Sequence, residues 1–146
     1  MRAAARWSTG LAAAWAGVLV CIASMAAPSA FATLSKVDAG RFVGRLFVEE
    51  AYLSLGLGML LFFVERRRAR IAAEAGFGSV FSTEMLLLLG TIFCTVAGYF
   101  AVQPMMAAAR LGQGAWSFGA LHTVSGGFFL LKTLLVAALA WRFSRW

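Results

Sequence analysis

The fold is decided by residues 85–103, which read MLLLLGTIFCTVAGYFAVQ. The stretch carries no charge, and at about 1.5 Å per residue it makes a helix about 28 Å long. This length is close to the ~30 Å thickness of the hydrocarbon core of a bilayer. In lipid the backbone polar groups find no water, so a segment of this kind crosses as an α-helix. The stretch therefore predicts a membrane protein.

The rest of the chain repeats this pattern. Of the 146 residues, 62% are hydrophobic and 13% are charged, against about 45–50% apolar residues in soluble domains. We predict an all-α fold, namely a polytopic membrane protein whose four transmembrane helices form an antiparallel bundle. The single domain, residues 1–146, would contain helices at about 9–32, 36–65, 84–104 and 116–142 and a cytoplasmic loop at 66–83.

The first helix has a rival interpretation as a cleaved signal peptide. Arg2 and Arg6 form a basic start, and Ala30-Phe31-Ala32 resembles a cleavage site. The apolar core of a signal peptide is usually about 7–15 residues long, whereas residues 7–35 are uncharged throughout. We therefore expect a retained helix.

Short polar motifs mark the helix boundaries. Ser35 begins a sequence that resembles a capping box. Ser82 or Thr83 can cap the third helix, and Glu84 suits the positive end of its dipole. Pro104 is expected to mark the end of that helix or a kink.

Basic residues predict the orientation. The two termini and the 65–84 loop carry eight of them, and the opposite side carries four, namely Lys36, Arg41, Arg45 and Arg110. The richer side faces the cytoplasm, so we place the chain in the inner membrane with both termini cytoplasmic. The cytoplasmic basic cluster comprises Arg66, Arg67, Arg68 and Arg70. It sets the topology, with anionic lipid as a second possible ligand. We expect no nucleic-acid partner.

Ionisable residues within the spans mark a candidate site, because each costs about 2.5–3.5 kcal/mol at the centre of a membrane. Lys132 lies about 15 Å above the cytoplasmic boundary, and Glu50 lies about 22 Å above it. The long lysine side chain closes much of this gap. We expect an intramembrane polar pair between Lys132 and Glu50 or Glu49.

A second group of polar residues lies farther out. Arg45, Gln103 and His122 fall about 28–30 Å from the cytoplasmic boundary, and Ser125 shares a helix face with His122. They would form an outer polar layer. Together the two layers are either a relay or substrate site between the second, third and fourth helices, or a structural device that holds the helices in register.

Two weaker patterns complete the candidates. His122, Met105 and Met106 could bind a soft metal such as Cu(I), although adjacent methionines point in different directions, and we assign no resident metal or other cofactor. Small residues allow close helix packing, and the candidates for it are Gly40, Gly44, Gly56, Gly126 and Gly127.

Three stretches resemble the transmembrane protein 205-like family, an uncharacterised four-helix membrane domain. They are Pro28-x-x-Phe31-Ala-Thr-Leu34, then Ala39-Gly40-Arg-x-Val43-Gly44-Arg-Leu46-Phe47, and Leu121-His122-x-Val124-Ser125 with its apolar tail ending at Trp141. The resemblance implies four membrane helices and a retained first helix. It implies little about chemistry. The layout is also distantly similar to copper-resistance membrane domains.

Three functions remain open on these residues. The first is a small transporter component or accessory subunit with a polar site between helices. The second is a copper or soft-metal handling protein that uses His122 with Met105 or Met106. The third is an integral membrane enzyme, for which no catalytic residue can be assigned. Membrane lipids are expected partners, and a homodimer or larger membrane complex is compatible with four helices.

Overall fold

The computed structural model describes residues 2–145, with side chains from Arg6 onward. Met1, Trp146 and the side chain of Arg2 therefore lie outside the described part. Within it the fold is all-helical, without strands. Four helical segments are long and apolar enough to cross a membrane: Arg6–Thr33, Lys36–Glu74, Thr83–Arg110 and Phe118–Phe143. The predicted all-α fold with four membrane helices is confirmed.

Several of these segments are built from consecutive helical pieces. The first comprises α1 (Arg2–Cys21), the π-helix η1 (Ile22–Ala26) and α2 (Ala27–Thr33). The second is α3 (Lys36–Glu74). The third comprises α4 (Thr83–Thr95), the π-helix η2 (Val96–Ala101) and α5 (Val102–Arg110). The fourth is α6 (Phe118–Phe143).

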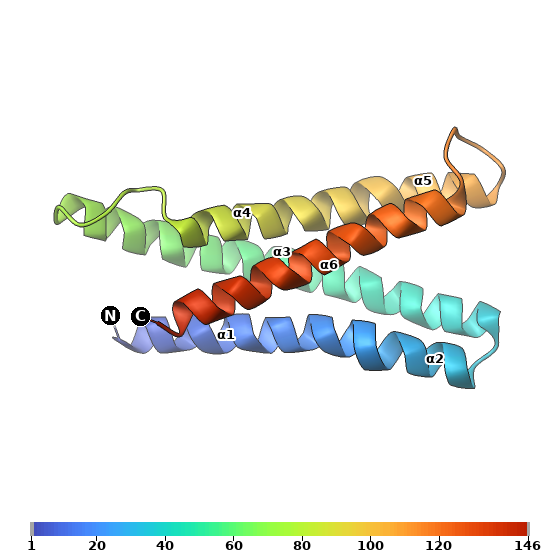
Figure 1. The fold of residues 1–146 in the computed structure, drawn as a ribbon, viewed down its shortest axis with the longest axis horizontal. Coiled ribbons are helices and arrows are strands. Elements are labelled where there is room, and N and C mark those ends of the chain that lie inside the picture. Colours follow the sequence, from blue (N-terminus) through green and yellow to red (C-terminus); the bar gives the residue numbers. More distant parts are fainter. Residues whose placement is uncertain (1, 146) are drawn as a thin grey trace.

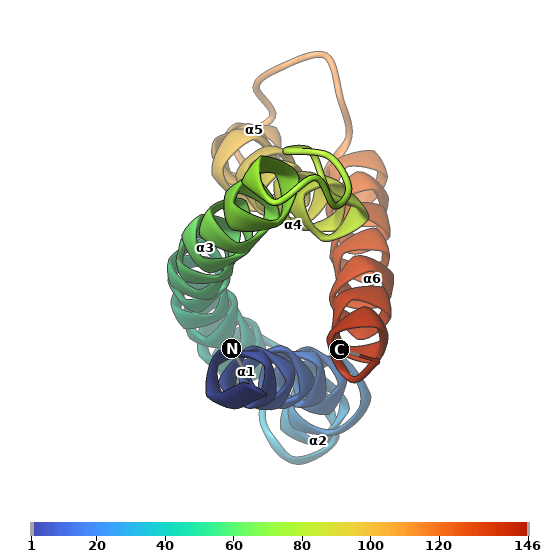
Figure 2. The ribbon, with the colours of Figure 1, turned by 90° about the vertical axis from the view of Figure 1, so that its left-hand side faces the viewer.

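Successive segments run back and forth along the long axis of the molecule, so that the two labelled chain ends lie at the same end (Figure 1). Viewed along the axis, α1, α3, α4 and α6 follow one another around a ring (Figure 2). The closest associations, α1 with α6, α6 with α4 and α4 with α3, agree with this order. Consequently α3 and α6 face each other across the bundle.

Serine side chains begin three of the helices. The Ser35 hydroxyl accepts a hydrogen bond from the Asp38 N–H (3.1 Å) and donates one to the Asp38 carboxylate (2.6 Å). Ser82 accepts from the Met85 N–H at 3.2 Å, and Ser117 caps α6 in the same way. Each hydroxyl satisfies a backbone donor that has no partner within its helix.

The second helix extends to Glu74, so the predicted helix end at 65 and the predicted loop at 66–83 were wrong. The connection is shorter and occupies residues 75–82. Arginine, alanine and glutamate favour helix, and ion pairs one turn apart support this one, Arg68 with Glu65 and Arg70 with Glu74. Charge ends the apolar stretch without ending the helix.

The third segment also passes its predicted end and continues through Pro104 to Arg110. Both prolines of the sequence, Pro28 and Pro104, follow closely after a π-helical segment. A proline lacks the N–H that an α-helix needs, and its ring clashes with the carbonyl four residues earlier. A wider π turn relieves this conflict, so each helix continues past its proline.

The core divides along the axis. At the end carrying the termini, all four segments share one cluster, which we call the shared core: Ala12, Trp15, Leu19, Leu61, Leu88, Val136, Leu139 and Phe143. Farther along, Ala30 packs with Ala39 and Val43, while Val102 and Met106 pack with Leu121. We call these pairs the α2–α3 arm and the α5–α6 arm; Figure 1 shows them apart at the end opposite the termini.

Large apolar side chains cover the outside of the spans. Phe63, Phe93 and Leu134 are each more than half exposed although they lie within the apolar segments. A soluble protein rarely exposes so extended an apolar surface. Lipid is the solvent that this surface requires.

Candidate functional site

The most buried charged contact joins Glu50 on α3 to Lys132 on α6. The lysine Nζ donates to Oε1 at 2.6 Å and to Oε2 at 2.8 Å. Both side chains are almost fully buried, with 2–3% exposed. Because α3 and α6 lie on opposite sides of the ring, this ion pair crosses the interior of the bundle (Figure 2).

Two further side chains extend the ion pair to a third helix. The Trp15 indole N–H on α1 donates to the Ser54 hydroxyl at 3.0 Å, and that hydroxyl donates to Glu50 Oε1. We call these four residues, Trp15, Ser54, Glu50 and Lys132, the polar chain. Among the described residues every buried side-chain nitrogen or oxygen has a hydrogen-bond partner, as low-dielectric surroundings demand.

Helical spacing positions these groups. Glu50 and Ser54 are one turn apart on α3 and share its inward face with Leu61. Gly58 continues this face, and a Cβ there would meet the Ile92 side chain at 3.0 Å. Small residues therefore bring α3 close enough to its neighbours for the polar chain to close.

Aromatic side chains cover the ion pair on the side of the arms. Phe129 lies one turn before Lys132, whose ammonium is 5.1 Å from the ring centroid. Phe47 lies one turn before Glu50, and its ring contacts that of Phe129 edge-on at 5.3 Å. Phe47 also packs against the cluster of the α2–α3 arm, whereas Phe129 packs against the shared core.

The ion pair also lies where the core divides. Along α3, Glu50 falls between Val43 of the α2–α3 arm and Leu61 of the shared core. Along α6, Lys132 falls between Leu121 of the α5–α6 arm and Val136 of the shared core. The pair therefore lies at the boundary between the shared core and the two arms.

Glu49, the alternative partner for Lys132, lies on another face of α3. Its carboxylate pairs with Arg45 one turn away at 2.8 Å, and both side chains are mostly exposed. Consecutive residues of a helix point about 100° apart, so only one of the two glutamates can face the bundle interior. That residue is Glu50.

The residues predicted as an outer polar layer have separate surroundings. Ser125 donates to the Gly98 carbonyl of η2 at 2.9 Å. His122 is exposed and stacks on Phe118 with ring centroids 5.8 Å apart. Gln103 is half-buried on α5, and Arg45 pairs with Glu49. The structure thus does not gather these four side chains into one network.

The soft-metal candidates have different surroundings. Met106 packs against Val102 and Leu121, Met105 is exposed, and His122 stacks on Phe118. Within residues 2–145 no group of three or more histidine, cysteine, aspartate or glutamate side chains is placed to hold a metal ion.

The expected helix-packing glycines do not pack within this chain. A Cβ added at Gly40, Gly44, Gly56, Gly126 or Gly127 would meet nothing within 4 Å. Close approaches occur instead at Gly58, Gly90 and Gly98. The closest is at Gly98, where an added Cβ would lie 2.5 Å from the Phe128 Cβ. Spacing along a helix does not tell which face turns inward, and these five glycines do not lie at contacts within this chain.

A second polar network, which the sequence did not predict, lies at the end of the bundle that carries the termini. Buried Glu65 accepts from Arg68 (2.8 and 2.9 Å) and from Ser82 (2.6 Å). Buried Glu84 accepts from the Arg142 Nε–H at 2.9 Å. These contacts tie α3, α4 and α6 together. The sequence feature that could have predicted this network is the position of both glutamates at the ends of apolar spans.

The predicted basic cluster belongs partly to this network. Arg68 is bound to Glu65, and Arg70 pairs with Glu74 in the last turns of α3. Arg66 and Arg67 are exposed. Half of the cluster is thereby committed to contacts within the helix.

Four apolar helices around a buried ion pair define a multi-pass helical membrane protein. Residues 10–115 match the model of a family described as a domain of unknown function (DUF4149), and the chain belongs to this family. The matched part includes Trp15, Glu50 and Ser54 but ends before α6, which carries Lys132. No curated protein and no solved structure matches the chain significantly.

Proposed function

We propose that this protein is a small transport component of the inner membrane whose ionisable site is the Glu50–Lys132 pair. The observation that carries the proposal is a fully buried ion pair located where the shared core divides into two arms. Ionisable residues at such depth are by default candidates for ion or proton pathways.

Stability alone is a weak explanation for the pair. Replacing a buried ion pair by well-packed apolar residues is often neutral or stabilising. The shared core already joins all four segments by apolar contacts. If these two positions served stability alone, two leucines could therefore occupy them.

The polar chain favours access from the arms. An indole nitrogen can only donate a hydrogen bond, so Trp15 ends the chain and cannot pass a proton beyond α1. An approach to Glu50 and Lys132 from the arms would lead past the Phe47–Phe129 contact. A proton or ion that reaches Glu50 from this side would neutralise it and release Lys132.

Proton flux into liposomes tests the proposal. Purified protein is reconstituted with a pH-sensitive dye inside, and a potassium diffusion potential drives proton entry. We expect flux above that of empty liposomes for the wild type and for Glu49→Gln, the adjacent exposed glutamate. Glu50→Gln should reduce the flux at least tenfold. Equal flux for Glu50→Gln and the wild type, or no flux for the wild type, contradicts the proposal.

The orientation belongs to the same proposal. We infer that both termini are cytoplasmic, which the excess of basic residues at that end supports. Kinship with the transmembrane protein 205-like family rests on the motifs at 28–34, 39–47 and 121–125. A homodimer would double the number of helices available to a transport pathway.

A further inference from the structure

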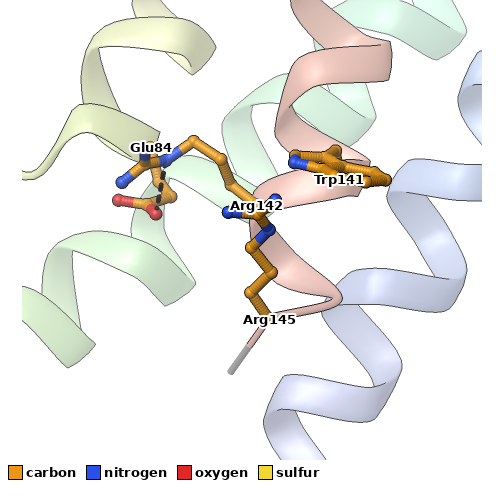
Figure 3. Close-up of a pocket in the computed structure, with 4 residues that line it drawn as sticks. All are labelled: Glu84, Trp141, Arg142 and Arg145. Carbon is orange, nitrogen blue, oxygen red and sulfur yellow. Dashed lines mark hydrogen bonds and ion pairs between the residues drawn. The ribbon is translucent and has the colours of Figure 1, made fainter.

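A hollow of about 300 Å³ lies at the end of the bundle, away from the polar chain. It is lined by Glu84 at the start of α4 and by Trp141, Arg142 and Arg145 at the end of α6 (Figure 3). Its volume falls at the lower end of the range of small-molecule sites, about 300–1,000 Å³. The lining is almost entirely charged or amphipathic.

The side chains that line the hollow are held in place by one another. The Glu84 carboxylate is buried and accepts from the Arg142 Nε–H at 2.9 Å (Figure 3). This contact leaves the two terminal amino groups of the Arg142 guanidinium as donors. The Arg145 guanidinium lies 4.6 Å from the centroid of the Trp141 ring, which places a second set of N–H donors beside the hollow.

The charges in the lining do not cancel. Glu84 and Arg142 compensate each other, whereas no ion pair joins Arg145 to a carboxylate of the described residues. The lining therefore carries one net positive charge. An oxyanion with a single negative charge would neutralise it.

We propose that this hollow binds a phosphate oxyanion. Planar guanidinium groups suit phosphate because they donate two parallel hydrogen bonds. Phosphate can come from a lipid headgroup or from solution. The lipid source has support from position, because Trp141 and the arginines lie at the end of the apolar span, where aromatic and basic side chains meet headgroups.

The proposal is independent of transport. Glu50 and Lys132 take no part in the hollow, and its lining lies at the far end of α6 from the arms. A negative result in the proton-flux experiment would not contradict phosphate binding in the hollow. Likewise, a failure to bind phosphate would not contradict the proposed transport.

The test compares binding of phosphatidylglycerol, phosphatidylcholine and inorganic phosphate to the purified full chain in neutral detergent, by native mass spectrometry and by the shift in Tm. The key variant is Arg145→Gln, which keeps the Glu84–Arg142 contact and should fold. The matched control is Arg6→Gln, because Arg6 is exposed near the start of α1, at the same end of the bundle, but lies outside both the hollow and the basic cluster of α3.

We expect phosphatidylglycerol to bind more tightly than phosphatidylcholine, and Arg145→Gln to raise its apparent Kd about tenfold, as the loss of a charge-assisted contact implies. Arg6→Gln should leave the Kd within twofold. If inorganic phosphate binds and Arg145→Gln weakens this binding to the same extent, the site is supported and its ligand is phosphate from solution. Equal effects of Arg145→Gln and Arg6→Gln on the binding of both phosphatidylglycerol and inorganic phosphate would overturn the proposal.

Discussion

At the scale of single residues, the Glu50–Lys132 pair is the most consequential contact. Among the described residues, the Lys132 ammonium donates hydrogen bonds to Glu50, and the Glu50 carboxylate accepts from Lys132 and Ser54. Removing one partner leaves a buried charge without compensation, which costs about 3–5 kcal/mol. Replacing both residues by apolar side chains removes both charges, and the neighbouring shared core can pack against these side chains.

This asymmetry gives a stability prediction. Lys132→Met should lower the free energy of unfolding by about 3–5 kcal/mol, whereas the double variant Glu50→Leu/Lys132→Met should lie within about 1 kcal/mol of the wild type. The measurement is reversible unfolding in micelles. Arg45→Met, which breaks the exposed Arg45–Glu49 pair, should change stability by no more than about 1 kcal/mol. A double variant as unstable as the single one would show that the pair is essential to folding.

The sequence could locate this pair only to within one residue on α3. Counting the helical rise from the span ends placed Lys132 and the two glutamates at compatible depths. The choice of Glu50 depends on the rotation of α3, which its neighbours determine. Trp15 and Ser54 could not be foreseen for the same reason, since both belong to residue types that are common in membrane spans.

At the scale of elements, the length of each helix is decided by more than its apolar stretch. α3 continues past Glu65 because its charged residues pair with each other along the helix. The third segment continues past Pro104 because η2 widens the helix before it. The apolar stretch determines which part of a helix lies in the membrane, whereas these local contacts determine where the helix ends.

Ser82 caps α4 and also binds α3. Replacing it should therefore lower the free energy of unfolding by more than the loss of an ordinary helix cap does. Its hydroxyl accepts from Met85 N–H and donates to buried Glu65. Ser117 is the matched control, because it caps α6 through the same contact alone. We expect Ser117→Ala to cost about 1 kcal/mol and Ser82→Ala about 1 kcal/mol more, both measured by unfolding in micelles. Equal losses would mean that the Ser82–Glu65 contact contributes nothing.

At the scale of the whole molecule, the division of the core is the feature that the sequence conceals. All four apolar segments are long enough to pack along their full length, so their length does not distinguish arm from core. The distinction arises from packing: α6 runs from the end of α1 at the termini to α5 at the opposite end (Figure 1). Beyond its own segment, α2 therefore packs mainly on α3, and α5 mainly on α6.

The divided core predicts unequal local stability, which hydrogen exchange can measure. Backbone amides in the arms should open more readily than those of the shared core, because fewer buried apolar contacts hold them. Within the third segment, α5 should exchange faster than α4, with the change falling at η2. Within the first, α2 should exchange faster than α1, with the change at η1.

The matched control is α3, which crosses the same depth without a π-helical segment or a proline. Its protection should fall gradually from the part near Leu61 to the part near Val43, without a step. If α5 and α4 exchange alike in micelles, or if α3 shows a step as sharp as that at η2, the arms do not open independently. In that case the ion pair cannot be reached by separating them, and the route past Phe47 and Phe129 is closed.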